Sequence, residues 1–451
     1  MTLLDEAIAR YHRILDSQAY KDHGWAEALH AEMRAHNLTA GGRPISPVLR
    51  PHFVMQRQYT ALVKAAELLF SAVDRIKQLA LATPALLARL ELLPAEKMLA
   101  AVDPGYPFLS VTSRLSTHLD NGNLRFVDYN ADTPTGVAYA EALSDIFYEC
   151  PPVKEFRKRY GLIKSGGTRQ LLQALLRTYK EFGKKQSPRI AIVEFRQPFQ
   201  SFDSDELVLL RESFRKAGYQ TEIASPDQLE YRGGVLRRAD FAIDLVYRRV
   251  KVQEFLVRFD LNHPLVRAYR EGAICMVNSF RSELAHKKAI FDLLTDETVT
   301  AAFPAAERKV IRDHIPWTRV VAAAKVTRQG EQVDLIDFIQ KNRGKLALKP
   351  NDDSGDQHSF HGWELDDTAW ERALKTALRA PYVVQERIAP PVASFPVYQW
   401  GEVQMRDLNI DLHPHAFLGK VQGCSSWVSA ADTPGFSTLS GLAPTFIIET
   451  K

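Results

Sequence analysis

Cysteine is scarce in this 451-residue chain, and its three cysteines lie far apart: Cys150, Cys275 and Cys424. This spacing excludes a disulfide framework and a cysteine-based zinc module, and it fits a reducing compartment. The chain also lacks a run of about 18 apolar residues, so we expect no membrane span. The N-terminus carries Asp5 and Glu6 where a signal peptide would be basic, which favours a cytoplasmic location.

Neither sign of charge is in excess, because 58 basic side chains face 54 acidic ones and the formal net charge is +4. No block of lysine and arginine stands out, so nucleic acid is not the expected partner. Two nucleotide-binding signatures are absent as well. The sequence has no Walker A motif, and no Gly-x-Gly-x-x-Gly follows the apolar segment 190–195, which disfavours a nucleotide-cofactor oxidoreductase.

Helical and strand patterns are present, and the length suggests two or three domains of roughly 150 residues each. Apolar residues recur at helical spacing through 1–20 and again through 59–99. Within the second stretch, Pro84 and Pro94 predict breaks between consecutive helices. We therefore expect a mostly helical N-terminal region over residues 1–104.

The pattern changes after residue 104. Asn121-Gly122 is a tight-turn signal between the segments 109–119 and 124–129, and it predicts a β-hairpin. From about residue 188, short apolar strands alternate with amphipathic helices, which predicts a parallel sheet covered by helices. The strands are expected at 189–195, 220–224, 241–247 and 273–277, and the helices at 165–181, 204–217 and 252–260.

A second unit of helices and strands is expected after residue 283. Its predicted elements are a helix over 286–294, a strand at 346–349, a helix over 368–378, a strand at 382–388 and several strands over 403–448.

A lysine ends one of these strands and is followed by a loop of small residues. Lys349 precedes Pro-Asn-Asp-Asp-Ser-Gly, so that Ser354 and Gly355 lie in the loop. An ammonium group and the N–H groups of such a loop can together hold a phosphate. The alternative is a solvated strand end followed by an ordinary turn.

Two oxygen-bearing side chains stand two residues apart on the second strand of the predicted hairpin. Asp128 and Asn130 share one face of that strand, because side chains alternate between faces. Carboxylate and amide oxygens suit a hard cation such as Mg²⁺. The alternative is an edge strand running into an Asx turn at Asp132-Thr133-Pro134.

Three further features carry weaker signals. A predicted strand turns polar at Gln385 and Glu386, and such a strand can present backbone groups to a base edge unless it is an ordinary half-buried strand. Lys287 or Lys288 is a candidate for facing an anion, unless both belong to a solvated basic turn. Three histidines match no familiar metal-binding spacing: His358, His361 and His413.

The order of these segments resembles that of a known family. A strand carrying Asp-Tyr-Asn-Ala-Asp-Thr-Pro-Thr (128–135) precedes the α/β unit. His-Lys-Lys, Leu-Lys-Pro-Asn-Asp-Asp-Ser-Gly and Val-Val-Gln-Glu follow it in that order. This order is similar to that of the circularly permuted ATP-grasp proteins, especially the synthetase domain of glutathionylspermidine synthase, in which the Glu-x-Asn strand comes first instead of last. The resemblance covers roughly residues 105–450.

The resemblance implies an α/β fold with α+β elements that is ATP-grasp-like and circularly permuted. Residues 105–185 are then the permuted segment that carries the Asp-x-Asn strand. Residues 186–282 form a parallel-sheet domain like the one that precedes ATP-grasp domains, and residues 283–451 form the nucleotide-binding subdomains. Residues 1–104 remain the helical N-terminal region.

The resemblance also implies an activity. Enzymes of this family bind ATP and Mg²⁺, phosphorylate a carboxylate to an acylphosphate, and let an amine displace the phosphate to give an amide. Metal ions and cationic side chains neutralise the charge of the transferred phosphoryl group. The implied function is an ATP-dependent carboxylate–amine ligase whose partners are a small-molecule or peptide carboxylate and an amine. Nothing in the sequence indicates an oligomeric state.

The family's site residues carry over onto this sequence one by one. Asp128 and Asn130 match metal ligands, Ser116 stands at the position of another, and Arg114 matches an arginine near the transferred phosphoryl group. The residues that match nucleotide contacts are Lys287 or Lys288, Lys349, Ser354, Gly355, Gln385, Glu386 and Ile388. The residues that match contacts to a peptide substrate are Thr133 and Thr135.

One candidate substrate contact comes from the residues alone. Arg248 and Arg249 follow the apolar strand predicted at 241–247, and a guanidinium there can hold a substrate carboxylate in a bidentate fork. The alternative is a solvated strand end.

Departures from the family pattern bear on activity. Ser116 stands where the family tends to have Asp, Asp128 is one methylene shorter than Glu, and 423–428 contains no Arg. The loss of one metal ligand and one cation weakens both metal binding and charge neutralisation. The alternative function is therefore a catalytically degenerate ATP-grasp protein that binds nucleotide or a peptide partner without ligation.

Overall fold

A computed structural model of the chain describes residues 2–120, 122–184, 186–195, 205–328, 330–352, 358–431 and 439–449. Its centre is an antiparallel sheet in the order β23-β22-β21-β4-β5, with β20 paired to β21. The strands are β4 (Thr112–Asp120), β5 (Asn123–Asn130), β20 (Val392–Gln399), β21 (Glu402–Phe417), β22 (Lys420–Ala430) and β23 (Gly441–Ala443). The predicted hairpin is confirmed as β4 and β5, and Gly122 in its turn has a φ of +86°.

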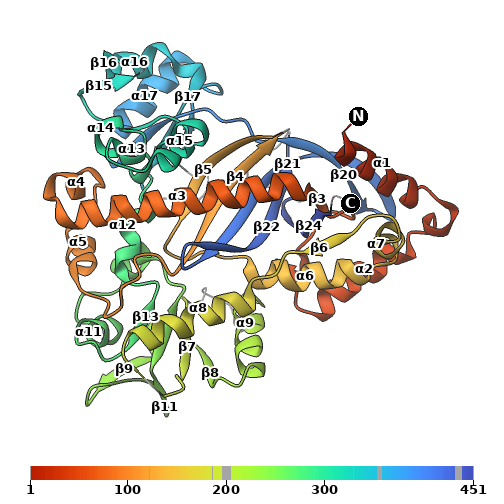
Figure 1. The fold of residues 1–451 in the computed structure, drawn as a ribbon, viewed down its shortest axis with the longest axis horizontal. Coiled ribbons are helices and arrows are strands. Elements are labelled where there is room, and N and C mark those ends of the chain that lie inside the picture. Colours follow the sequence, from red (N-terminus) through yellow and green to blue (C-terminus); the bar gives the residue numbers. More distant parts are fainter. Residues whose placement is uncertain are drawn as a thin grey trace.

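One face of this sheet packs against the long helix α3 (Gln56–Ala82), which crosses the molecule in Figure 1. Leu115, Leu412 and Ala416 point to this face and join one hydrophobic core with Leu69 and Phe70 of α3. The opposite face of the sheet is therefore the one that can carry polar side chains.

The predicted N-terminal helices are confirmed as α1 (Leu3–Leu15), α3, α4 (Pro84–Arg89) and α5 (Pro94–Ala101), and α2 (Gly24–Ala35) joins them. Pro84 and Pro94 each occupy the first turn of the helix they begin, where a missing N–H has no cost. Two short strands, β1 (Thr39–Ala40) and β2 (Arg43–Pro44), follow α2.

A three-stranded sheet joins distant parts of the sequence. β24 (Thr445–Ile448) pairs in parallel with β3 (His52–Met55) and antiparallel with β6 (Leu162–Lys164). The helices α6 (Val137–Glu149) and α7 (Pro151–Arg157) lie beside it, and their apolar side chains share a core with α1. Residues 1–104 are thus packed against later segments of the chain.

The expected parallel sheet is confirmed, in the order β13-β12-β7-β8. Its strands are β7 (Ile190–Val193), β8 (Thr221–Ala224), β12 (Leu245–Arg248) and β13 (Cys275–Val277). The associated helices are α8 (Thr168–Glu181), α9 (Asp205–Lys216), α10 (Val252–Arg258) and α11 (Pro264–Arg270).

The single strand predicted at 241–247 is wrong, because the structure divides it between two sheets. β11 (Phe241–Ile243) belongs to an antiparallel sheet with β10 (Val235–Arg238) and β9 (Leu229–Arg232), whereas β12 belongs to the parallel sheet. Asp244 lies at the division, where its carboxylate accepts hydrogen bonds from the backbone N–H of Arg189 (3.0 Å) and from its guanidinium (2.9 Å).

The second unit contains an antiparallel sheet in the order β14-β19-β17-β18. Its strands are β14 (Thr318–Val320), β17 (Leu346–Pro350), β18 (Phe360–His361) and β19 (Tyr382–Glu386), and a separate hairpin joins β15 (Lys325–Arg328) to β16 (Glu331–Asp334). Its helices are α14 (Glu297–Thr300), α15 (Ala305–His314), α16 (Leu335–Lys341) and α17 (Asp367–Ala377).

The predicted helix over 286–294 is interrupted, and forms α12 (Glu283–His286) and α13 (Ile290–Leu294). Lys287 is extended (φ −64°, ψ 131°) and the backbone N–H of Lys288 donates to Asn351 O at 2.8 Å, so the chain leaves the helical path between them.

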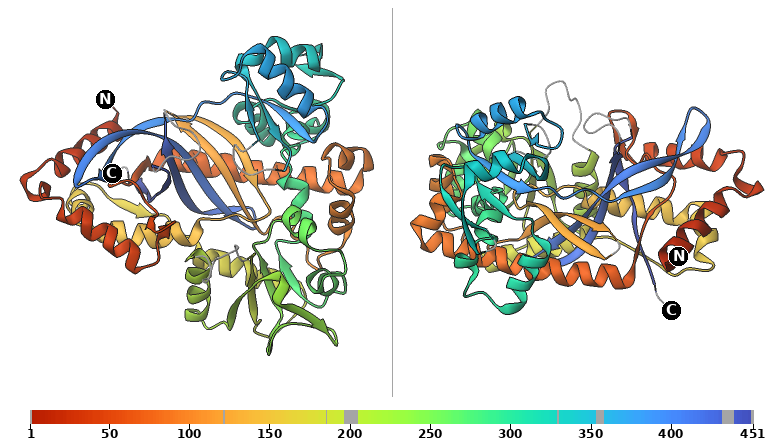
Figure 2. Two further views of the ribbon diagram at one scale, coloured as in Figure 1. Left: turned by 180° about the vertical axis from the view of Figure 1, so that it is seen from behind. Right: turned by 90° about the horizontal axis from the view of Figure 1, so that it is seen from above.

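The two α/β units lie on opposite sides of α3 in Figure 1, and Figure 2 shows them from behind and from above. Among the residues that the structure describes, no helix is long and apolar enough to cross a membrane.

Candidate functional site

A β-bulge turns the polar residues of β5 away from α3. Ser116 pairs with Asp128, whereas the next residue of β4, Thr117, already pairs with Phe126. One residue of β5 is therefore extra, and the alternation of side chains shifts by one. Phe126 packs in the core against α3, while Asp128 lies on the opposite face. Without this bulge the two side chains would share a face.

Four predicted site residues lie together on this opposite face, which we call the polar face of the central sheet. The register of the hairpin places Arg114 beside Asn130 and Ser116 beside Asp128. Along the two strands these four residues alternate with Leu115 and its partner Tyr129, whose side chains are in the core, so all four point to the opposite face. The structure thus confirms that Asp128 and Asn130 share one face.

Two lysines from other segments approach Asp128. Lys288 Nζ lies 3.5 Å from Asp128 Oδ1. Burial acts to raise the pKa of the Asp128 carboxyl, but the positive charges of Lys288 and Lys349, with smaller effects of His286 and Arg114, hold it below its usual value. A carboxylate is thus kept ionised among cations that come from α12–α13, from β17 and from β4.

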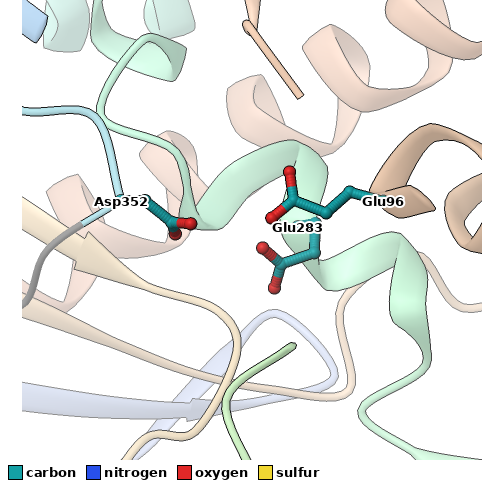
Figure 3. Close-up of side chains that lie close together, drawn as sticks. All are labelled: Glu96, Glu283 and Asp352. Atoms are coloured by element: carbon teal, nitrogen blue, oxygen red, sulfur yellow. The ribbon is translucent and has the colours of Figure 1, made fainter. Parts of the chain in front are cut away.

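Lys287 points elsewhere, into a cluster of three carboxylates. Figure 3 shows Glu96 of α5, Glu283 of α12 and Asp352, which follows β17, pointing toward one another. Lys287 Nζ lies 2.8 Å from Glu96, 2.6 Å from Asp352 and 3.5 Å from Glu283. We call this group the Lys287 cluster, and its cation is the ammonium of Lys287 itself. Of the two adjacent lysines, Lys288 is therefore the one that faces the polar face.

The charges of the Lys287 cluster affect one another. Burial lowers the pKa of the Lys287 ammonium, but Glu283, Asp352 and Glu96 outweigh it and raise that pKa above its usual value. Burial, followed by the negative charge of Asp132, raises the pKa of the Glu283 carboxyl well above its usual range. Burial thus favours the neutral form of Glu283, while Glu96 and Asp352 are the carboxylates that lie nearest to the Lys287 ammonium.

Three residues of β21 extend the polar face, and the sequence analysis missed two of them and discounted the third. Asp411, His413 and His415 alternate with Leu412 and Ala416, which are in the core. Asp411 Oδ1 accepts a hydrogen bond from the N–H of Thr117 (2.8 Å), and its Oδ2 lies 3.0 Å from His413 Nε2. The polar–apolar alternation of this strand was the available signal.

The segment after Asn130 forms a side-chain turn. Asn130 Oδ1 accepts a hydrogen bond from the N–H of Thr133, three residues further along the chain, at 3.1 Å. Arg114 Nη1 lies 3.4 Å from Thr135 Oγ1, so Thr135 adjoins the polar face. Burial lowers the pKa of the Arg114 guanidinium, although Asp411 and Asp128 act against this.

Arg248 lies in the interior, and its donors are used within the protein. Its guanidinium forms an ion pair with Asp132, and both side chains are 1% exposed. It also donates to Asn278 O (3.0 Å) and to Ser282 Oγ (2.8 Å). This geometry favours a structural role over the predicted role in holding a substrate carboxylate, because a buried guanidinium with these partners offers no free fork.

The predicted nucleotide contacts of the second unit lie on and after β19. Gln385 Nε2 donates to Thr318 Oγ1 (3.2 Å), Glu386 accepts from Arg328 (2.7 Å), and Ile388 is half-buried. Their contact with a nucleotide stays a prediction. Ser354 and Gly355 lie outside the described residues.

Comparison with known proteins addresses the fold. No family model and no curated protein sequence matches this chain. Among solved structures, a glutathione synthetase-like effector (GSS30) from Globodera pallida, in its apo form, superposes with a TM-score of 0.59. The match covers 94% of this chain and 96% of that one, at 14% identity. The chain shares the fold of this effector. The predicted α/β, ATP-grasp-like fold is thereby confirmed.

A second solved structure is more distant. It is a protein from Methylobacillus flagellatus KT assigned as a γ-glutamylcysteine synthetase, with a TM-score of 0.44 and 12% identity over 88% of this chain and 87% of that one. At 14% identity the likeness to the effector concerns the fold alone.

Proposed function

We propose that this protein is an ATP-dependent ligase that joins a carboxylate to an amine through an acylphosphate, as the resemblance to glutathionylspermidine synthase implies. One observation carries the proposal. Asp128, on the polar face beside Asn130 and Arg114, is approached by Lys288 and influenced by Lys349, which come from two separate segments. Convergent cations around an ionised carboxylate are what binding of a metal–triphosphate complex requires.

The donor set fits Mg²⁺. This ion takes oxygen ligands and is bound by one or two carboxylates together with substrate phosphates, and Asp128 and Asn130 supply a carboxylate and an amide oxygen on one face. Bound Mg²⁺ would neutralise phosphate charge. Lys349 and Lys288 are the side chains that would hold phosphate oxygens, and Arg114 would orient the transferred group beside Asn130.

Ser116 favours a second candidate function. It occupies the position next to Asp128 with a neutral hydroxyl, which is a weaker Mg²⁺ ligand than a carboxylate. A protein that binds nucleotide or a peptide partner without ligation is therefore the alternative proposal.

Thermal unfolding with ATP, with and without Mg²⁺, tests nucleotide binding first. A ligand at about 100 times its Kd stabilises the native state by roughly 2.7 kcal/mol. We expect Mg·ATP to raise the Tm, Lys349→Met to remove this rise, and the matched variant Lys345→Met, an exposed lysine just before β17, to keep it. An undiminished rise in Lys349→Met would refute the assignment of the phosphate site.

ADP release separates the two candidate functions. A panel of amino-acid and short-peptide carboxylates, each with and without a primary amine, is added to the protein with Mg·ATP. ADP release that needs both additions supports the ligase. Tm protection by ATP without such release favours the degenerate binder.

A further inference from the structure

The N-terminal helices contact the segments that carry the site lysines through Asn351, the residue after β17. This side chain is 2% exposed. Its backbone oxygen accepts from the N–H of Lys288 (2.8 Å), and its Oδ1 accepts from the N–H of Ala289 (2.9 Å). Its Nδ2 donates to Leu90 O at the end of α4 (3.0 Å). One buried side chain thus joins the end of β17, the α12–α13 junction and the N-terminal region.

Glu96 makes a second connection from the N-terminal region, and it uses both carboxylate oxygens. Its Oε2 accepts from the N–H of Leu93 (2.8 Å), which caps α5, while its Oε1 lies 2.8 Å from Lys287 Nζ. Glu96 is 0% exposed and Lys287 is 2% exposed, so water does not weaken this pair. Asp352 holds the same ammonium from the other side at 2.6 Å.

The position of Lys288 follows from these contacts. Lys287 and Lys288 are consecutive, and the extended conformation of Lys287 sends the two side chains in different directions. Lys287 is fixed in its cluster, and the backbone of Lys288 is fixed on Asn351. The Lys288 side chain therefore points to the polar face, where its Nζ lies 3.5 Å from Asp128 Oδ1.

We propose that Glu96 of α5 is a positioning residue that holds Lys288 against Asp128 through Lys287, so that the N-terminal helical region is part of the nucleotide site. The role of Lys288 toward a nucleotide rests on the proposed function, but its placement does not. Groups that orient a binding side chain from behind alter affinity without touching the ligand.

The test compares two buried carboxylates. Glu96→Gln removes the charge beside Lys287 and keeps the shape of the side chain. Glu307→Gln is the matched control, because Glu307 is also buried and pairs with Arg75 (2.9 Å) between α15 and α3. One readout is the rate at which acetic anhydride acetylates Lys288, which peptide mass spectrometry measures. The Lys288→Met variant identifies the labelled peptide that reports on Lys288. The other is the Kd of Mg·ATP.

We expect Glu96→Gln to raise the labelling rate of Lys288 several-fold and to weaken Mg·ATP binding by about tenfold. Glu307→Gln should leave both quantities at the wild-type level even where it lowers the Tm. Wild-type labelling and wild-type affinity in Glu96→Gln would overturn the proposal. If Glu96→Gln does not fold, Glu96→Asp decides, because it keeps the charge but shortens its reach and should change both readouts in the same direction.

The labelling also separates this proposal from the proposed function. If the wild-type protein does not bind Mg·ATP, the proposed nucleotide site fails, while the labelling rate of Lys288 still decides whether Glu96 positions it.

Discussion

Replacement of Glu283 by glutamine should stabilise the protein at neutral pH. Glu283 is 1% exposed, and neither carboxylate oxygen has a hydrogen-bond partner within the described part of the chain. Burial, and after it the charge of Asp132, raises the pKa of this carboxyl well above its usual range. The folded protein therefore keeps a proton on Glu283 at pH values where the unfolded chain has released it.

The sign and size of the effect follow from proton linkage. The unfolded carboxyl titrates near pH 4.5, whereas the folded one titrates at a higher pH. The wild-type free energy of unfolding accordingly loses about 1.4 kcal/mol for each pH unit above 4.5, until the folded group ionises too. Glutamine has no proton to keep. The stability gained by Glu283→Gln should be near zero at pH 4 and should grow as the pH rises above 4.5, by at most about 1.4 kcal/mol per pH unit.

Urea unfolding of both proteins between pH 4 and pH 8 measures this difference. Glu307→Gln serves as the control, because its carboxylate is paired with Arg75 and its loss should not stabilise the protein. The reasoning is refuted if Glu283→Gln is less stable than the wild type at pH 7 and the deficit shrinks toward pH 4. That result would mean that Glu283 is ionised and paired with Lys287.

Two further predictions concern Arg248 and Ser116. Arg248→Met should lower the free energy of unfolding by about 3–5 kcal/mol, because it leaves the buried Asp132 without its cation. Urea unfolding measures this change. A variant with near-wild-type stability would contradict a structural role for Arg248. Ser116→Asp should lower the Mg²⁺ concentration that gives half-maximal protection by ATP by about tenfold, since it adds a carboxylate beside Asp128. A titration of Tm against Mg²⁺ checks this, and an unchanged midpoint would exclude Ser116 from the metal site.

Much of the fold could be predicted because its helix starts and turns depend on residues that are close together in the sequence. Pro84 and Pro94 mark helix starts, and Gly122 marks the hairpin turn. The order of the motifs, in which the strand that carries Asp128 precedes the α/β unit, resembles that of the permuted ATP-grasp proteins, and this resemblance implied the fold class.

Pairings between distant segments could not be predicted in this way. β3 is four residues long, and nothing in its local sequence specifies that it pairs with β24. The strand predicted at 241–247 is divided at Asp244, whose partner Arg189 lies just before β7 and 55 residues earlier in the chain. Contacts between segments that are far apart in the sequence leave no local pattern from which they could be predicted.

The site shows the same limit. Asp128 and Asn130 could be placed on one face because the spacing of two is a property of any strand, although the bulge that gives this face its polar character had no signal in the sequence. The sequence could not show which of Lys287 and Lys288 faces the polar face, because Lys287 is drawn away by Glu96, which lies 191 residues earlier in the chain. Asp411 could have been placed on this face from the alternation of polar and apolar residues along β21, whereas the spacing of the histidines carries no such signal.

The parallel pairing of β3 with β24 has a consequence for synthesis on the ribosome. β3 leaves the exit tunnel early, but its partner strand is among the last described segments to be translated. During most of translation the apolar side chains of Phe53 and Val54 have no sheet to join, although both are buried in the finished protein. An unpaired apolar strand in a nascent chain invites wrong pairing, and this part of the protein can complete its core only once β24 has been synthesised.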